Sequence, residues 1–130
     1  MHEEVVQPTL VLLSDERFAD VDSLYRKAFD RALSGDPSGA ITAATSAAEE
    51  MLRLLIPSMK GQTLGPLAEK ARADGLIPPA MEEFTKKLYA LREDSDAHQA
   101  GTSEFELAMF AIHIAGSILL YLGRTSAPTS

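Results

Sequence analysis

The sequence contains no cysteine, which excludes several kinds of site at once. A disulfide framework, a thiolate metal site and a cysteine nucleophile are all impossible, and the composition suits a reducing cytoplasm. Its three histidines, His2, His98 and His113, are too far apart in sequence for paired metal ligands. A Gly-Lys-Ser phosphate loop and a nucleophile elbow are also missing. We therefore expect neither a metal nor a cofactor.

Long uninterrupted apolar runs are missing as well. The longest, residues 107–122, is shorter than the ~20 residues that a membrane-spanning helix needs and contains His113, Gly116 and Ser117. We interpret it as a buried helix that could also pack against a second subunit, with His113 as a core or interface histidine that bonds locally. No charged and then apolar segment opens the chain, so we expect no secretory signal. These features predict a cytoplasmic protein without membrane contact.

Positive charge is scarce. Twelve lysines and arginines stand against 19 aspartates and glutamates, which gives a formal net charge of −7. An acidic chain is repelled by nucleic acid at long range. Any site for RNA must therefore supply local positive charge against that field.

The remaining pattern predicts an all-α protein. Apolar residues recur at helical spacing, no stretch alternates like a strand, and short loops favour an antiparallel bundle of four to five helices. We expect a bundle over residues 15–124, an extended N-terminal arm over residues 1–14 and a disordered tail over residues 125–130. The predicted helices cover residues 15–33, 37–56, 63–74, 81–92 and 103–123. Asp36-Pro37 starts the second helix, and Ser103 caps the last. One face of the fourth helix carries Met81, Phe84, Leu88 and Leu91.

One polar segment, residues 91–101, separates the last two predicted helices. It contains Arg92 and His98, which would point roughly 240° apart on an uninterrupted helix. The two side chains can converge only if the chain leaves helical geometry between them. Asp94, Ser95 and Asp96 favour such a break, because their side chains compete for backbone hydrogen bonds.

An arginine and a histidine brought together suit phosphodiester chemistry without a metal. The guanidinium offers fixed charge and several donors to a phosphoryl group, and imidazole can exchange a proton near neutral pH. The alternative is that Arg92 only satisfies the last carbonyls of its helix and that His98 has no role. A single Arg-x5-His match is a weak motif, so the pattern alone favours this alternative.

Residues 28–122 resemble the abortive-infection C-terminal domain, a branch of the HEPN superfamily of all-α ribonucleases and nucleotide-binding domains. The resemblance rests on the order of several pieces: residues 32–37 followed by residues 40–44, Glu49 and then Arg53, and Arg92 through His98 before an apolar helix. It implies a homodimer in which two Arg–His pairs line one cleft and cleave RNA without a metal, leaving a 2′,3′-cyclic end.

The resemblance also implies roles for four residues. His98 would be the general acid or base, Arg92 would hold the phosphate, Glu49 would orient one of them, and Asp96 would position the loop. A ribonuclease of this kind would serve phage defence or a toxin–antitoxin pair, with an antitoxin or another defence protein as partner. The alternative is a non-catalytic helical module for dimerisation or ligand binding, which the acidic balance and Glu93 favour.

Overall fold

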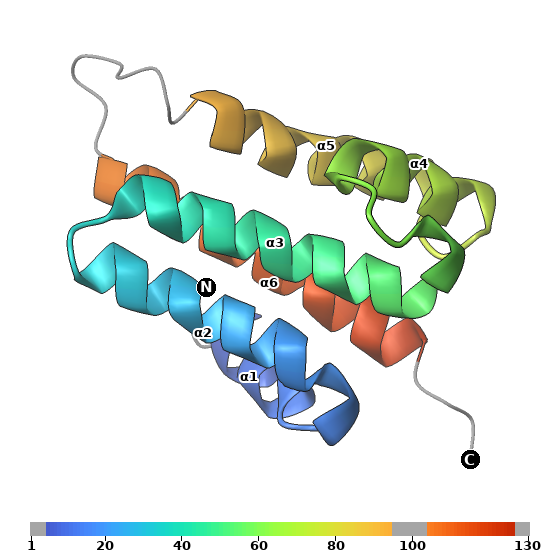
Figure 1. The fold of residues 1–130 in the computed structure, drawn as a ribbon, viewed down its shortest axis with the longest axis horizontal. Helices are drawn as coiled ribbons and strands as arrows, with labels where there is room; N and C mark the ends of the chain where they lie inside the picture. Colours follow the sequence, from blue (N-terminus) through green and yellow to red (C-terminus); the bar gives the residue numbers. More distant parts are fainter. Residues whose placement is uncertain (1–4, 95–103, 127–130) are drawn as a thin grey trace.

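The computed structural model describes residues 5–94 and 104–126, with the backbone alone at residues 93 and 94. Every regular element in this part of the chain is helical (Figure 1). The six α-helices are α1 (Gln7–Leu13), α2 (Ala19–Leu33), α3 (Pro37–Leu55), α4 (Leu64–Ala73), α5 (Pro79–Asp94) and α6 (Glu104–Thr125), with short 3-10 turns at Glu16–Phe18 and Pro57–Met59. The predicted all-α class is confirmed, whereas the predicted number of helices is too small.

The additional helix is α1, where we expected an extended arm. Val6, Thr9 and Leu13 recur at helical spacing and are buried, and the helix packs against α6. The Thr9 hydroxyl donates to the carbonyls of Val5 (2.5 Å) and Gly116 (3.1 Å). The extended-arm prediction is therefore wrong for residues 7–13, because the buried face of this short helix is defined by its packing against α6.

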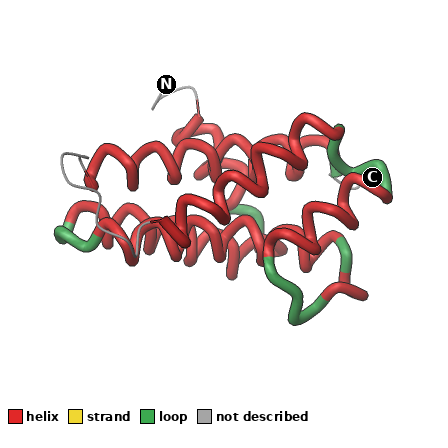
Figure 2. Tube along the Cα trace, turned by 90° about the horizontal axis from the view of Figure 1, so that it is seen from above, coloured by secondary structure: helices red, strands yellow, loops and turns green. Residues whose placement is uncertain are grey.

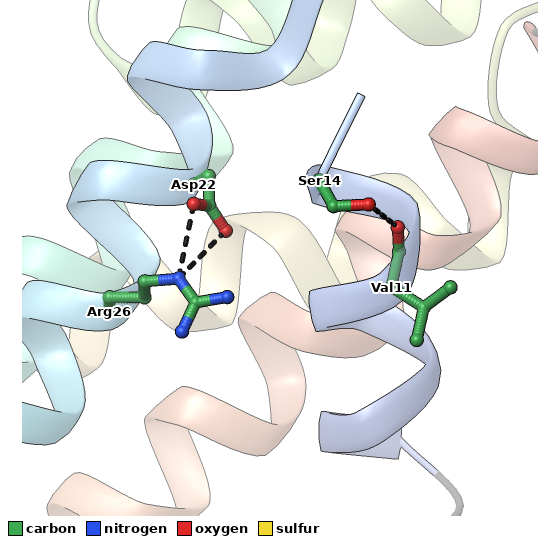
Figure 3. Close-up of polar contacts among 4 residues, drawn as sticks. All are labelled: Val11, Ser14, Asp22 and Arg26. Atoms are coloured by element: carbon green, nitrogen blue, oxygen red, sulfur yellow. Dashed lines mark hydrogen bonds and ion pairs between the residues drawn. The ribbon is translucent and has the colours of Figure 1, made fainter. Parts of the chain in front are cut away.

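The ends of several helices follow from local chemistry. The Asp36 carboxylate accepts a hydrogen bond from the Gly39 amide (2.9 Å), and Pro37 occupies the first position of α3, as predicted. Gly35, at a φ of +82°, allows the chain to turn out of α2. After α1, the Ser14 hydroxyl donates to the Val11 carbonyl at 2.6 Å (Figure 3). The predicted cap Ser103 and the tail residues 127–130 lie outside the described residues, and α6 continues through Thr125.

Helix α3 is the centre of the bundle. Helices α2 and α6 pack along it, α5 lies on another side, and short loops connect the helices from α1 to α5 (Figures 1 and 2). The alanines at positions 40, 43, 44, 47 and 48 of α3 are all buried, which lets neighbouring helices approach closely. The Tyr25 hydroxyl of α2 donates to the Ile112 carbonyl of α6 (3.2 Å), and burial raises the pKa of this tyrosine.

Ion pairs hold α4 and α5 together. The Glu82 carboxylate lies 2.6 Å from Arg72 of α4 and 3.0 Å from Lys86, which also reaches Glu69 of α4 at 3.1 Å. Glu82 is turned inward, whereas Phe84 is 62% exposed. Of the four apolar residues predicted on one face of this helix, Leu88 is fully buried, whereas Phe84 lies at the exposed edge of that face.

Helix α6 is apolar around most of its circumference. By length and composition it could cross a membrane, although a core helix passes the same test, and 44% of its most apolar stretch is buried within the chain. Nδ1 of His113 lies 2.7 Å from the Met109 carbonyl, the local hydrogen bond expected from the sequence. One side of α6 is thus part of the core, and the other side is exposed on the surface of the chain.

Candidate functional site

Arg92 stands in the last turn of α5, where the sequence predicted the end of a helix. Its guanidinium carbon lies 4.5 Å from the centroid of the Tyr89 ring, one turn earlier on the same helix. A cation over an aromatic ring is held by the ring quadrupole, which restricts the guanidinium to the end of α5. Helix α5 ends toward the same end of the bundle at which α3 and α6 begin (Figure 1). The predicted role of Arg92 in holding a phosphate stays a prediction.

His98 and Asp96 lie outside the described residues. Helix α5 ends at Asp94 and α6 begins at Glu104, so both predicted residues belong to the segment that connects these helices. The convergence of Arg92 and His98 stays a prediction.

Glu49 has partners of its own within the bundle. Its side chain is 6% exposed, accepts a hydrogen bond from the Leu64 amide at 2.9 Å, and lies 3.8 Å from Arg53. Leu64 is the first residue of α4, and the hydroxyl of the preceding Thr63 makes no capping bond. Glu49 therefore takes the place of a side-chain cap, where the helix dipole favours a carboxylate. Its predicted role beside Arg92 or His98 stays a prediction.

A polar groove that the sequence did not reveal lies between α2 and α3. It has a volume of about 230 Å³ and is lined by two cations, three hydroxyls and small residues: Leu24, Lys27 and Arg31 from α2, and Ser38, Gly39, Thr42, Ala43 and Ser46 from α3. The three hydroxyls stand one turn apart along α3, a spacing that a sequence pattern could have shown. The facing cations from α2 could not have been matched to them without the fold.

The exposed face of α6 is the second feature that the sequence left open. Phe110 is 56% exposed and Tyr121 is 38% exposed, and Ser117 lies exposed between them. These positions are seven and four residues apart, so they lie along one side of the helix and form the α6 stripe. Exposed large apolar side chains on one side of a helix mark an interaction surface more often than isolated ones do.

Within the part of the chain that the structure describes, no three carboxylates or histidines gather closely enough to hold a metal ion. The structure thus offers three candidate sites: Arg92 with Tyr89, the α2–α3 groove and the α6 stripe. No protein-family model, no curated protein and no solved structure matches this chain.

Proposed function

We propose that this chain is a HEPN-like, metal-independent endoribonuclease that works as a homodimer, with Arg92 and His98 as its catalytic pair. The observation that carries the proposal is the position of Arg92, in the last turn of α5 and immediately before the segment that contains His98. From there the guanidinium can offset charge on a phosphodiester while the imidazole moves the proton of the 2′-hydroxyl. A cytoplasmic role in phage defence or a toxin–antitoxin pair belongs to the same proposal.

The α6 stripe supplies the interface of the proposed dimer. Glu106 and Arg124 are exposed near opposite ends of the helix, about 27 Å apart at 1.5 Å per residue. In an antiparallel pair of α6 helices that crosses near Ala115, Glu106 would approach Arg124 of the partner subunit. The same symmetry sets Phe110 beside Tyr121 of the partner subunit. The apolar stripe thus matches a second copy of itself in both shape and charge.

The nuclease is tested by incubating a mixed RNA pool with the folded protein in EDTA. We expect cleavage with 2′,3′-cyclic ends by the wild type, loss of cleavage in His98→Ala and in Arg92→Ala, and unchanged cleavage in the matched controls His2→Ala and Arg26→Ala, which removes an exposed arginine of α2. Removal of a group that acts in the transition state lowers the rate by about 10²–10⁴-fold. Full activity in His98→Ala would exclude this mechanism.

The dimer is tested with cysteine chemistry, because the chain has no cysteine of its own. In the antiparallel arrangement the Ser117→Cys variant places two thiols close to the symmetry axis, so a short bis-maleimide should link two chains at low protein concentration. The Ser34→Cys variant, just beyond the end of α2, is the control and should stay unlinked. Equal linking of both variants would mean random collision, and no linking of Ser117→Cys would exclude this interface.

A non-catalytic dimerisation module is the second candidate, and one observation favours it. Glu49, the carboxylate that the resemblance places in the site, is engaged with Leu64 and Arg53. A module needs only the α6 stripe, so it predicts dimers in the wild type and in Arg92→Ala, with no RNA cleavage by either. Dimers together with EDTA-resistant cleavage by the wild type alone would decide for the nuclease.

A further inference from the structure

The groove between α2 and α3 carries positive charge in an acidic protein. Lys27 and Arg31 are one helical turn apart on α2 and line the same groove. Like charges at this spacing repel each other by a few tenths of a kcal/mol, about as much as opposite charges attract. An anion placed between them would remove that repulsion.

The two cations differ in their partners. Arg31 lies 2.9 Å from the Asp36 carboxylate, which is also held by the Gly39 amide. Lys27 forms no ion pair with any residue that the structure describes, whereas its neighbour Arg26 is bound to Asp22 at 3.1 Å (Figure 3). Lys27 is therefore a cation of the groove without a counter-charge among the described residues.

The opposite wall supplies donors. Ser38, Thr42 and Ser46 make no hydrogen bond with the described residues, although threonine hydroxyls of α3 and α5 do. Thr45 donates to the Ile41 carbonyl and Thr85 to the Met81 carbonyl, each at 2.8 Å. A helical hydroxyl commonly turns back to the preceding turn in this way. The groove hydroxyls are instead available to a ligand that accepts hydrogen bonds.

A glycine at the groove makes room for the cap of α3. A Cβ atom at position 39 would overlap the Asp36 carboxylate, which accepts the hydrogen bond of the Gly39 amide. The same carboxylate pairs with Arg31. Asp36 therefore links the cap of α3 to one cation of the groove.

We propose that this groove binds a phosphoryl group, carried either by a small phosphate ester or by the backbone of RNA. Lysine and arginine with hydroxyl donors are the usual protein partners of phosphate oxygens. The volume of about 230 Å³ is below the ~300–1,000 Å³ of pockets that enclose whole drug-sized ligands, so a single anionic group fits it better than a complete nucleotide. No residue of α5 lines this groove, and the proposal does not depend on the proposed nuclease.

The test follows backbone amide signals of ¹⁵N-labelled protein during titration with inorganic phosphate, against sodium chloride at equal ionic strength. We expect saturable shifts in residues 24–31 and 38–46 with phosphate only. Lys27→Ala should weaken binding about tenfold and Thr42→Val about threefold, in line with one charged and one neutral hydrogen bond. Lys87→Ala, which removes an exposed lysine of α5, should bind like the wild type.

Two results would overturn the proposal: phosphate shifts that do not saturate up to about 50 mM, far above a millimolar site, or equal losses in Lys27→Ala and Lys87→Ala. Circular dichroism verifies that each variant is folded, and Lys27 is exposed, so its replacement leaves the core intact. Parallel titrations with adenosine 5′-monophosphate and with a short single-stranded RNA separate the two sources. Tighter binding of the mononucleotide identifies a phosphate ester, and tighter binding of the RNA identifies the backbone.

Discussion

The two faces of α6 are both apolar, but only one of them is covered. The inner face carries small or branched aliphatic residues, among them Ala111, Ala115 and Leu119, and each of these is fully buried. The outer face carries the aromatic residues Phe110 and Tyr121, which are 56% and 38% exposed. The inner face is therefore aliphatic, whereas the outer face combines aromatic side chains with the exposed Ser117.

The difference follows from how closely the helices approach. Helix α3 carries a row of buried alanines, and α6, which packs against α3, also carries buried alanines. Closely packed helices need small residues at the contact, since an aromatic ring there would push the axes apart. The aromatic residues Phe110 and Tyr121 are therefore placed on the side of α6 that faces away from α3.

The largest effect is expected on the inner face. Leu119→Ala removes a fully buried side chain and leaves a cavity, so the free energy of unfolding should fall by about 2–5 kcal/mol. Urea denaturation of the purified variant measures it. Leu33→Ala is the matched control, because that leucine is 76% exposed and its loss should change stability by less than about 0.5 kcal/mol. Equal losses in the two variants would contradict the described packing.

A smaller effect is expected where α6 meets Tyr25. A methyl group at position 116 would overlap the Tyr25 hydroxyl, which overpacks the core by about 1–3 kcal/mol, while the better helix propensity of alanine returns about 1 kcal/mol. Gly116→Ala should thus lose up to about 2 kcal/mol. Gly65→Ala on α4 is the control, since nothing lies within 4 Å of the added methyl group. That variant should be neutral or slightly more stable.

A double-mutant cycle sharpens this prediction. Tyr25→Phe removes the hydroxyl and its hydrogen bond to Ile112, at a cost of about 1 kcal/mol. Because the overlap disappears with the hydroxyl, Gly116→Ala should be less harmful in that background. Simple additivity of the two losses would show that the overlap is relieved by another movement.

Local signals in the sequence were enough for the fold class and for most helix boundaries. Asp36-Pro37 was predicted to start a helix and does so, because a cap and a fixed φ act within four residues. The helix at residues 7–13 was not predicted, because its short buried face packs against the glycines of α6 and this contact exists only in the folded chain. The inward turn of Glu82 was missed because its partner Arg72 comes from another helix.

In the candidate site, too, local signals predicted one feature, whereas the features that depend on contacts between helices were missed. The end of a helix close to Arg92 was predicted from the polar residues that follow, and this holds to within two residues. The attachment of Glu49 to the start of α4 joins positions 15 residues apart, and no periodic pattern shows such a contact. The groove between α2 and α3 likewise requires two helices to be placed side by side before its cations and hydroxyls face one another.

Helix α6 carries few titratable groups. We therefore expect the ion pairs between α4 and α5 to make the stability of the fold depend on acid pH. The ammonium of Lys86, and then the guanidinium of Arg72, lowers the pKa of Glu82 from its usual 4.5. A carboxyl with a lowered pKa stabilises the fold above its unfolded pKa, and this contribution is lost as the pH falls through the folded pKa. Below pH 4.5 the stability of the wild type should therefore fall more steeply than that of Glu82→Gln. Glu83→Gln, an exposed neighbour, should keep the steep fall, and thermal melts across this pH range compare the three proteins.

The smallest effect on the stability of a single chain is expected on the outer face of α6. Phe110→Ala should change the free energy of unfolding of the monomer by less than about 0.5 kcal/mol, because its side chain is already more than half exposed. Self-association adds a second measurable quantity, the dependence of the melting temperature on protein concentration. If a second copy covers Phe110, the melting temperature of the wild type rises with protein concentration, since association stabilises only the folded state.

That dependence on concentration should be lost in Phe110→Ala and kept in the control Leu33→Ala, which also removes an exposed apolar side chain. Melting curves across a hundredfold range of concentration, together with sedimentation equilibrium, measure both quantities. A wild-type melting temperature that does not move with concentration would show that the outer face of α6 is not covered by a second copy. A partner other than a second copy would then be needed to cover the aromatic side chains of the α6 stripe.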